Sequence, residues 1–300
     1  MRQSLQRVVV TGRGVLLPQG RTPVALAAFR AQIAKPETPP RIADFRAADY
    51  ISHPKLLRVM QRTFALTAAA AVLAMREAGV GDSTALSAVH PNPARCGVAV
   101  AMADISPLTP DLIETLRESL IGGELNLERF GETARHHLHP FRRLSLLANM
   151  AAAHISLLFG LQGPSFTLTS GLEAGGQSVH EAYWTIAEGA ADLMVCAAAD
   201  SPDYALTPSP VAEAGGSLVL ENLIQAQARG IPVLAELRAV SHAVAPPVPE
   251  SAAWAKSPGS GSLLAILAAL DDVGRDGAQA GLEFMHHAHG QPTDIRAVQS

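Results

Sequence analysis

The sequence predicts an α/β fold built in layers, with helices packed on a sheet that contains parallel strands. Two observations support this prediction. Apolar runs of strand length alternate with Ala-rich stretches of helix length. Between residues 166 and 198, a strand, a sharp turn, a helix and a second strand follow one another, which is the order of a βαβ unit with parallel strands. In such sheets, ligands and nucleophiles sit at the turns after the carboxyl ends of the strands.

The composition excludes several classes of protein. The 300 residues include 23 Lys+Arg and 27 Asp+Glu without a long run of one sign, which argues against non-specific nucleic-acid binding. With 48% hydrophobic and 17% charged residues, wholesale disorder is not expected. No apolar stretch reaches the ~18 uninterrupted residues of a membrane span, and no signal-peptide pattern opens the sequence. We therefore expect a soluble, cytoplasmic protein without membrane insertion.

The two cysteines, Cys96 and Cys196, are too few for a disulfide framework or a four-cysteine zinc site. Each lies in an apolar run of strand type, Cys-Gly-Val-Ala-Val and Leu-Met-Val-Cys-Ala. This setting favours a small buried hydrophobic residue over a reactive thiol.

Before residue 140, Gly and Pro separate the expected elements. A strand at 7–11 is expected to end at Gly12 and Gly14, with a loop over 13–20. The other elements expected here are a helix at 23–34, an irregular Pro-rich stretch at 35–60, a helix at 63–78 stopped by Gly79, a strand at 97–101, and a polar region of helix and loop at 104–140.

After residue 144 the pattern is more informative. The small-residue turn Ser170-Gly171 opens a helix that runs to Glu188. Tyr183 and Trp184 on this helix are expected to be packing residues. The other expected elements are helices at 144–159, 222–229 and 263–270, strands at 166–169, 193–198, 216–221, 233–240 and 282–286, and a Pro/Ser/Gly-rich connection at 244–261.

Two groups of histidines have side chains of a type that binds metal ions. The cluster His136, His137 and His139 has no carboxylate or cysteine at a matching spacing, so a solvated loop is the favoured interpretation. His286 and His287 alternate across the end of a strand, so both cannot face one ligand. No metal site is expected.

Several stretches, in order and over nearly the whole chain, resemble the β-ketoacyl synthase branch of the thiolase-like superfamily. The resemblance implies a thiolase-like fold layered αβαβα, without a cofactor, in which a strand, a turn and a helix carry a nucleophilic cysteine. The motif His286-His287-Ala288-His289-Gly290 resembles the Asn-Ala-His-Gly that carries the family's first catalytic histidine. The other similar stretches are 8–20, 149–165 with Phe-Gly-Leu-Gln-Gly-Pro-Ser, 177–195 with Gly-Ala-Ala-Asp-Leu-Met-Val, and 213–230.

The sequence departs from this family at the nucleophile. In place of a Thr-Ala-Cys-Ala-Ser-Gly type sequence, it has Ser-Gly-Leu-Glu-Ala-Gly at 170–175, with Leu172 in the position of the cysteine. The family's acyl transfer needs a thiolate there, activated by the helix N-terminus. Leucine cannot form a thioester, so we expect no intrinsic condensing activity.

A second departure concerns the C-terminal motifs. His289 lies 11 residues before the last residue (300 − 289), and the family's second catalytic histidine, which donates to a developing enolate oxygen, would lie further on. Gln291-Pro292-Thr293 replaces the family's Thr-Gly-Thr, and the linker between Asp200 and Glu213 is shorter. We therefore expect a ketosynthase-like N-terminal half at 1–230 and a truncated C-terminal half at 231–300, with His289 vestigial.

These departures indicate a silent subunit similar to the chain-length factors of type II polyketide synthases or to ketosynthase-like proteins of aryl polyene pathways. The resemblance implies a heterodimer with an active ketosynthase, whose acyl tunnel this chain would shape, and work with an acyl carrier protein. The dimer would form through the strand before the nucleophile position, since a bare sheet edge is unfavourable. The expected interface residues are Phe166, Thr167, Leu168 and Thr169.

Other interpretations stay open. Glu173 is favoured in a first helical turn by the helix dipole, or Leu172 and Glu173 together plug the vestigial acyl pocket, where burying one apolar side chain contributes about 1.5–3 kcal/mol. An acyltransferase or hydrolase activity could use Ser170 or His289. A non-functional gene remnant is a third possibility, against which the well-formed helix caps and turns argue.

Overall fold

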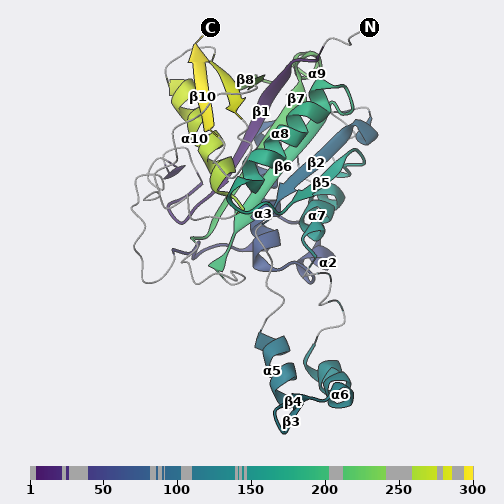
Figure 1. The fold of residues 1–300 in the computed structure, drawn as a ribbon. Coiled ribbons are helices and arrows are strands. Elements are labelled where there is room, and N and C mark those ends of the chain that lie inside the picture. The colour runs from purple at the N-terminus through teal and green to yellow at the C-terminus, as the bar shows by residue number, and fades with distance from the viewer. Residues whose placement is uncertain are drawn as a thin grey trace.

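The computed structural model describes residues 5–21, 25–26, 40–81, 86, 90, 92–102, 110–138, 141, 144, 147–202, 212–240, 259–275, 280–285 and 294–299. Within these residues one eight-stranded mixed sheet forms the centre, in the order β10-β9-β8-β1-β7-β6-β2-β5 (Figure 1). Its strands are β1 (Val8–Leu16), β2 (Cys96–Ala101), β5 (Ser165–Leu168), β6 (Leu193–Asp200), β7 (Ala214–Asn222), β8 (Ala235–Val240), β9 (Ala280–Met285) and β10 (Asp294–Gln299).

Helices cover both faces of this sheet. We call the face covered by α3 (Arg62–Glu77) and α7 (Asn149–Phe159) the α3 face, and the face covered by α8 (Ala174–Ala187) and α10 (Gly261–Arg275) the α8 face. Each face has its own core of buried apolar side chains. The shorter helical elements are η1 (Ala47–Asp49), α2 (Pro54–Leu57), η2 (Pro93–Arg95), η4 (Gly171–Glu173) and α9 (Leu223–Ala228).

The first strand is longer than expected. Gly12 and Gly14 do not end it, because both lie inside β1, which pairs with β7 as far as Leu16. A Cβ atom on Gly14 would lie 2.0 Å from the carbonyl oxygen of Ala70 in α3, and one on Gly12 would lie 2.1 Å from that of Ala74. These glycines therefore allow close contact between a helix and a strand, and the loop expected from residue 13 begins only after the strand.

The βαβ unit expected at 166–198 is confirmed. β5, α8 and β6 follow one another, and both strands run parallel to β2, which lies between them. α8 packs on the side chains of this unit, with Val179, Ala182 and Ile186 buried. Because the three strands are parallel, their carboxyl ends meet at one edge of the sheet, which includes the turn after β5. β5 is itself the outermost strand on this side.

The predicted α/β fold is confirmed, and the C-terminal strands extend the same sheet. β8 pairs with β1, β9 runs parallel to β8, and β10 pairs with β9. The strand β10 was not expected. The helix at 144–159 begins later, at Asn149, and ends as expected at Gly160, which has φ +70°. The expected helix at 23–34 and the connection at 244–261 fall mostly outside the described residues.

A two-helix arm stands apart from the sheet at the bottom of Figure 1. It consists of α5 (Pro110–Glu118), β3 (Leu120–Ile121), β4 (Glu124–Leu125) and α6 (Leu127–His137). The Asn126 side chain caps α6 by accepting from the Arg129 amide at 2.8 Å. His136 and His137, expected in a loop, lie instead in the last turn of α6, where the helix dipole favours them if they are protonated.

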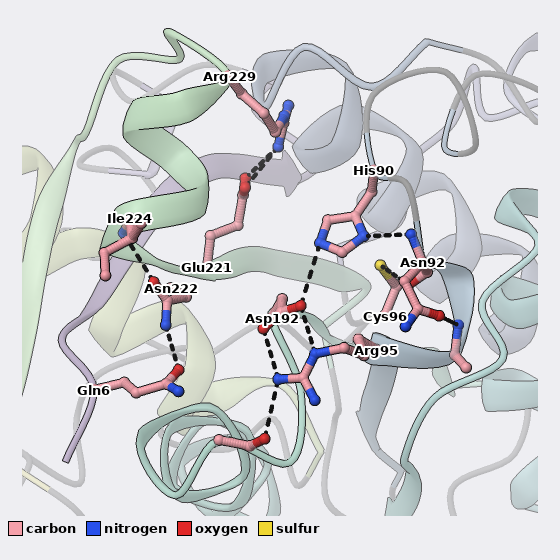
Figure 2. Close-up of polar contacts among 12 residues, drawn as sticks. Gln6, His90, Asn92, Arg95, Cys96, Asp192, Glu221, Asn222, Ile224 and Arg229 are labelled. Atoms are coloured by element: carbon pink, nitrogen blue, oxygen red, sulfur yellow. Dashed lines mark hydrogen bonds and ion pairs between the residues drawn. The ribbon is translucent and has the colours of Figure 1, made fainter. Parts of the chain in front are cut away.

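The amino ends of β2 and β6 are held together by ion pairs (Figure 2). Arg95, before β2, donates to both oxygens of Asp192, before β6, at 2.6 and 2.7 Å. Nearby, Arg229 donates to the buried Glu221 carboxylate at 2.6 and 2.7 Å. The end of the sheet opposite the β5 turn is therefore fixed by charged side chains.

Candidate functional site

The candidate site is the turn between β5 and α8. The chain leaves β5 through Thr169 and Ser170, passes through the single turn η4, and enters α8 at Ala174. Gly171 has φ +66°, a conformation that favours glycine. The backbone of Leu172 lies in the middle of η4. The strand, turn and helix predicted around Leu172 are therefore present.

Polar side chains around this turn contact one another. The Ser170 hydroxyl donates to the Gln177 side-chain oxygen at 2.5 Å, and the Gln177 amide lies 3.4 Å from a carboxylate oxygen of Glu173. Ser170 is exposed, and Glu173 is half-buried. A serine nucleophile needs a neighbouring general base, whereas the described partner of this hydroxyl is a neutral amide oxygen. The contacts support a structured turn, and they supply no activation of Ser170.

The amino end of α10 meets the carboxyl end of β6 beside this turn. Asp200, the last residue of β6, is buried, and its carboxylate accepts from the Gly259 amide at 2.9 Å and from the Ser260 amide and hydroxyl at 2.7 and 2.6 Å. Burial raises the pKa of Asp200, and the hydrogen bonds from Ser260 and Gly259 oppose this change. The carboxylate thus holds the start of α10 with neutral donors.

The start of α10 also touches the start of α8. The Gly176 amide donates to the Ser262 hydroxyl at 2.8 Å. A Cβ atom on Gly175 would lie 2.8 Å from the Leu263 amide nitrogen and 3.0 Å from the Gly259 carbonyl oxygen. The amino ends of two helices therefore converge at the candidate site, and their close contact depends on small residues.

On the α3 face, a second buried carboxylate lies just before β7. Glu213 pairs with Arg62 at the start of α3, and it accepts from the Ile42 amide at 2.8 Å and the Ser201 hydroxyl at 3.1 Å. Burial alone would raise the pKa of Glu213, but the hydrogen bonds from Arg62 and Ile42 outweigh it and hold that pKa below its usual range. Glu213 and Asp200 were missed as structural residues because their partners are distant in sequence.

Neither cysteine lies at the turn. Cys96 begins β2 and Cys196 lies within β6, and both are buried. Burial raises the pKa of Cys96 to about 12 and raises that of Cys196 as well. Both thiols therefore remain protonated at neutral pH, which confirms the expectation of small buried hydrophobic residues.

The other expected site residues are placed as follows. Phe166, Thr167 and Leu168 are half-buried in β5 at the sheet edge, and Thr169 is exposed just after it. His289, like His286, His287 and His139, falls outside the described residues, and so does the side chain of Leu172. In the described ranges, no three His, Cys, Asp or Glu side chains are grouped as a metal site requires. The same ranges contain no helix that is both long and apolar enough to span a membrane.

Comparison with known families agrees with this geometry. Residues 30–213 match the family model of the β-ketoacyl synthase N-terminal domain, and this range includes β2, β5, η4, α8 and β6. The chain therefore belongs to the β-ketoacyl synthase family, with the thiolase-like fold that the resemblance implied.

The chain is similar in sequence to two curated members of this family. It is 28% identical over 345 aligned positions to the 3-oxoacyl-[acyl-carrier-protein] synthase 2 of Vibrio harveyi, covering 99% of this chain and 76% of that protein. It is 26% identical over 239 positions to the Staphylococcus aureus protein of the same name, covering 67% and 57%.

Solved structures show the same fold. A ketosynthase of a type II polyketide synthase, solved with its acyl carrier protein, matches with a TM-score of 0.72 at 16% identity, over 99% of this chain and 100% of that one. The ishigamide ketosynthase/chain length factor matches with a TM-score of 0.53 at 24% identity, over 77% and 62%.

Proposed function

We propose that this chain is a catalytically silent subunit that pairs with an active β-ketoacyl synthase and shapes the acyl tunnel of that partner. The proposal rests on the η4 turn between β5 and α8, where the resemblance to the family assigns Leu172 to the position of the nucleophilic cysteine. The two cysteines of the chain support it, because they are buried, protonated and placed in strands away from the turn.

The edge strand supports pairing with another subunit. The Leu168 carbonyl accepts from Met102, and the Pro164 carbonyl accepts from Val98, so alternate residues of β5 bond toward β2. In a parallel strand the residues between them direct their amide and carbonyl groups to the other side. Thr167 therefore presents both backbone groups to the open edge, and a partner strand there would satisfy them.

This edge gives a test of the heterodimer. Thr167→Pro removes the outward N–H and leaves the ladder to β2 in place, since proline is tolerated on the open side of an edge strand. We expect Thr167→Pro to lose the complex with a ketosynthase co-expressed from the same genome, as measured by size exclusion with light scattering. Thr167→Val keeps the N–H and should retain the complex. If wild type forms no complex with the ketosynthase, the proposed function is wrong.

Mass spectrometry tests whether this subunit lacks acyl-transfer activity. After incubation of the complex with acyl-loaded carrier protein, the intact mass of the partner should increase by one acyl group, and that of this chain should not change. An acyl adduct on this chain would overturn the proposal. If Ser170→Ala abolished such an adduct, the chain would be an acyltransferase or hydrolase that uses Ser170.

A further inference from the structure

The contact between α3 and α7 buries polar side chains that have no hydrogen-bond partner. Gln61, the residue before α3, is 6% exposed, and His154 in α7 is fully buried. Both polar atoms of the Gln61 side chain and both ring nitrogens of His154 lack a partner among the residues that the structure describes. A buried donor or acceptor without a partner destabilises the packed state. This contact is therefore less favourable than an apolar contact of the same shape.

The two side chains are neighbours of the same aromatic ring. The ring centroids of Phe64 and His154 lie 5.9 Å apart. Gln61 precedes Phe64 by three residues, which is close to one helical turn, and the side chain of a helical residue leans toward the helix N-terminus. The unpartnered atoms are therefore gathered where the start of α3 packs against α7.

The chain is firmly attached at the C-terminal end of α7. Gly160 ends the helix with φ +70°. The Gly163 amide then donates to the Cys96 carbonyl at 2.8 Å, and the Gln162 amide donates to the Pro93 carbonyl at 3.0 Å. A Cβ atom on Gly163 would lie 2.8 Å from the Cys96 carbonyl oxygen. The backbone after α7 therefore lies directly on the start of β2.

The N-terminal end of α7 is held more weakly. Its N-cap residue, Ala148, has no side chain that caps the helix, and the first turn contains no acidic residue. Before His154, α7 buries the small side chains of Ala151 and Ala152, which contribute little hydrophobic burial. The larger buried side chains follow later in the helix, at Ile155, Leu158 and Phe159.

Burial alone opposes a charge on His154. α7 packs on α3, β2 and β5. The titratable side chains of these three elements are Arg62, Arg76, Glu77 and Cys96. None of them contributes to the pKa of His154, which burial lowers to about 4 from 6.5. Protonation of the ring therefore favours a state in which the ring contacts water.

We propose that α7 is an acid-sensitive cover, whose N-terminal part opens away from α3 about the fixed end at Gly160 when His154 is protonated. Because α7 packs on β2 and β5, its opening removes the cover of the edge strand β5 on the α3 face. The ladder between β5 and β2 is formed by the strands themselves and stays paired. This inference does not depend on the proposed function.

Hydrogen exchange at increasing urea concentrations separates this opening from global unfolding. Amides at 151–155 should exchange faster than those of β1 and with little dependence on urea, because a local opening exposes little surface. After correction for the intrinsic exchange rate at each pH, the opening constant should rise about fifteenfold between pH 6.5 and pH 5. Equal protection and equal urea dependence in α7 and β1 would overturn the proposal.

Variants identify the group that triggers the opening. His154→Gln and His154→Leu cannot bind a proton, so their opening constants should be the same at pH 6.5 and pH 5. Gln61→Leu removes the unpartnered amide and should lower the opening constant about fivefold at both pH values. His53→Gln, at an exposed position, is the control and should keep the wild-type pH dependence. The proposal is wrong if the His154 variants keep the rise in acid, if wild type opens equally at both pH values, or if Gln61→Leu opens as readily as wild type.

Discussion

The two faces of the sheet are held together by different interactions. On the α3 face, the backbone of α3 lies directly on the backbone of β1, because Gly12 and Gly14 have no side chains between them. On the α8 face, side chains bind the amino ends of helices: Asp200 holds α10, and Ser262 accepts from α8. The contact of α3 with β1 depends on the absence of side-chain volume, whereas the contact between the ends of α8 and α10 combines a small residue, Gly175, with buried hydrogen bonds. The candidate site lies on the second face, where single polar atoms fix two helix ends.

Substitution of Gly14 should cause the largest loss of stability, because it separates α3 from the sheet. In Gly14→Ala the new methyl group would lie 2.0 Å from the Ala70 carbonyl oxygen, and neither backbone can yield without separating the helix from the strand. We expect a loss of about 3 kcal/mol in the free energy of unfolding, the upper range for overpacking, measured by urea denaturation. Gly131→Ala in α6 is the matched control, because its Cβ would meet no atom within 4 Å. A wild-type stability for Gly14→Ala would show that the two layers separate easily.

Substitution of Asp200 on the α8 face should cause a smaller loss of stability. Asp200→Ala leaves the buried Gly259 and Ser260 amides without an acceptor, which costs about 2 kcal/mol. Because α10 also supports the start of α8, hydrogen exchange should increase in both helices. Asp44→Ala removes a carboxylate whose side chain is 86% exposed and should leave stability unchanged. Faster exchange confined to α10 would contradict the coupling of the two helix ends.

The same contrast explains how much the sequence could predict. The Ala-rich pattern of α3 and the succession of strand, turn, helix and strand at 166–198 are local signals, so α3 and the βαβ unit could be predicted from them. The candidate site at the turn was predicted from the resemblance to the family. The sequence predicts a strand end at Gly12 and Gly14. From sequence alone, a glycine that lets a helix pack closely on a strand cannot be distinguished from a glycine that begins a turn. β10, with the sequence Asp-Ile-Arg-Ala-Val-Gln, has only short apolar segments and was missed.

The polar contacts of the site were less predictable. Asp200 lies 59 and 60 residues before the amides that it accepts from, and Glu213 follows Arg62 by 151 residues. No local pattern connects such partners. An acidic residue that ends the buried run Leu-Met-Val-Cys-Ala-Ala-Ala-Asp was nevertheless a usable signal, because burial of a carboxylate requires donors nearby.

Protonation of His154 has the smallest expected effect on the free energy of unfolding, and it tests the α3 face through the pH dependence of stability. His154 lies in α7 on the α3 face and is fully buried beside Phe64, and neither ring nitrogen has a hydrogen-bond partner among the residues that the structure describes. Burial lowers the pKa of His154 to about 4 from 6.5, so the fold favours the neutral imidazole. Its contribution to stability is fully present above pH 6.5 and is lost as the pH falls toward 4. We expect a loss of about 1.5 kcal/mol between pH 6.5 and pH 5.

His154→Leu should remove this loss, because it replaces an unpartnered polar ring with an apolar side chain. The measurement is the free energy of unfolding in urea at each pH, for wild type, His154→Leu and the exposed control His53→Leu. Only His154→Leu should have a flatter pH dependence in this window. If His154→Leu keeps the pH dependence of the wild-type free energy of unfolding, the acid sensitivity arises from other groups. The α3 face would then accommodate a charged imidazole at residue 154.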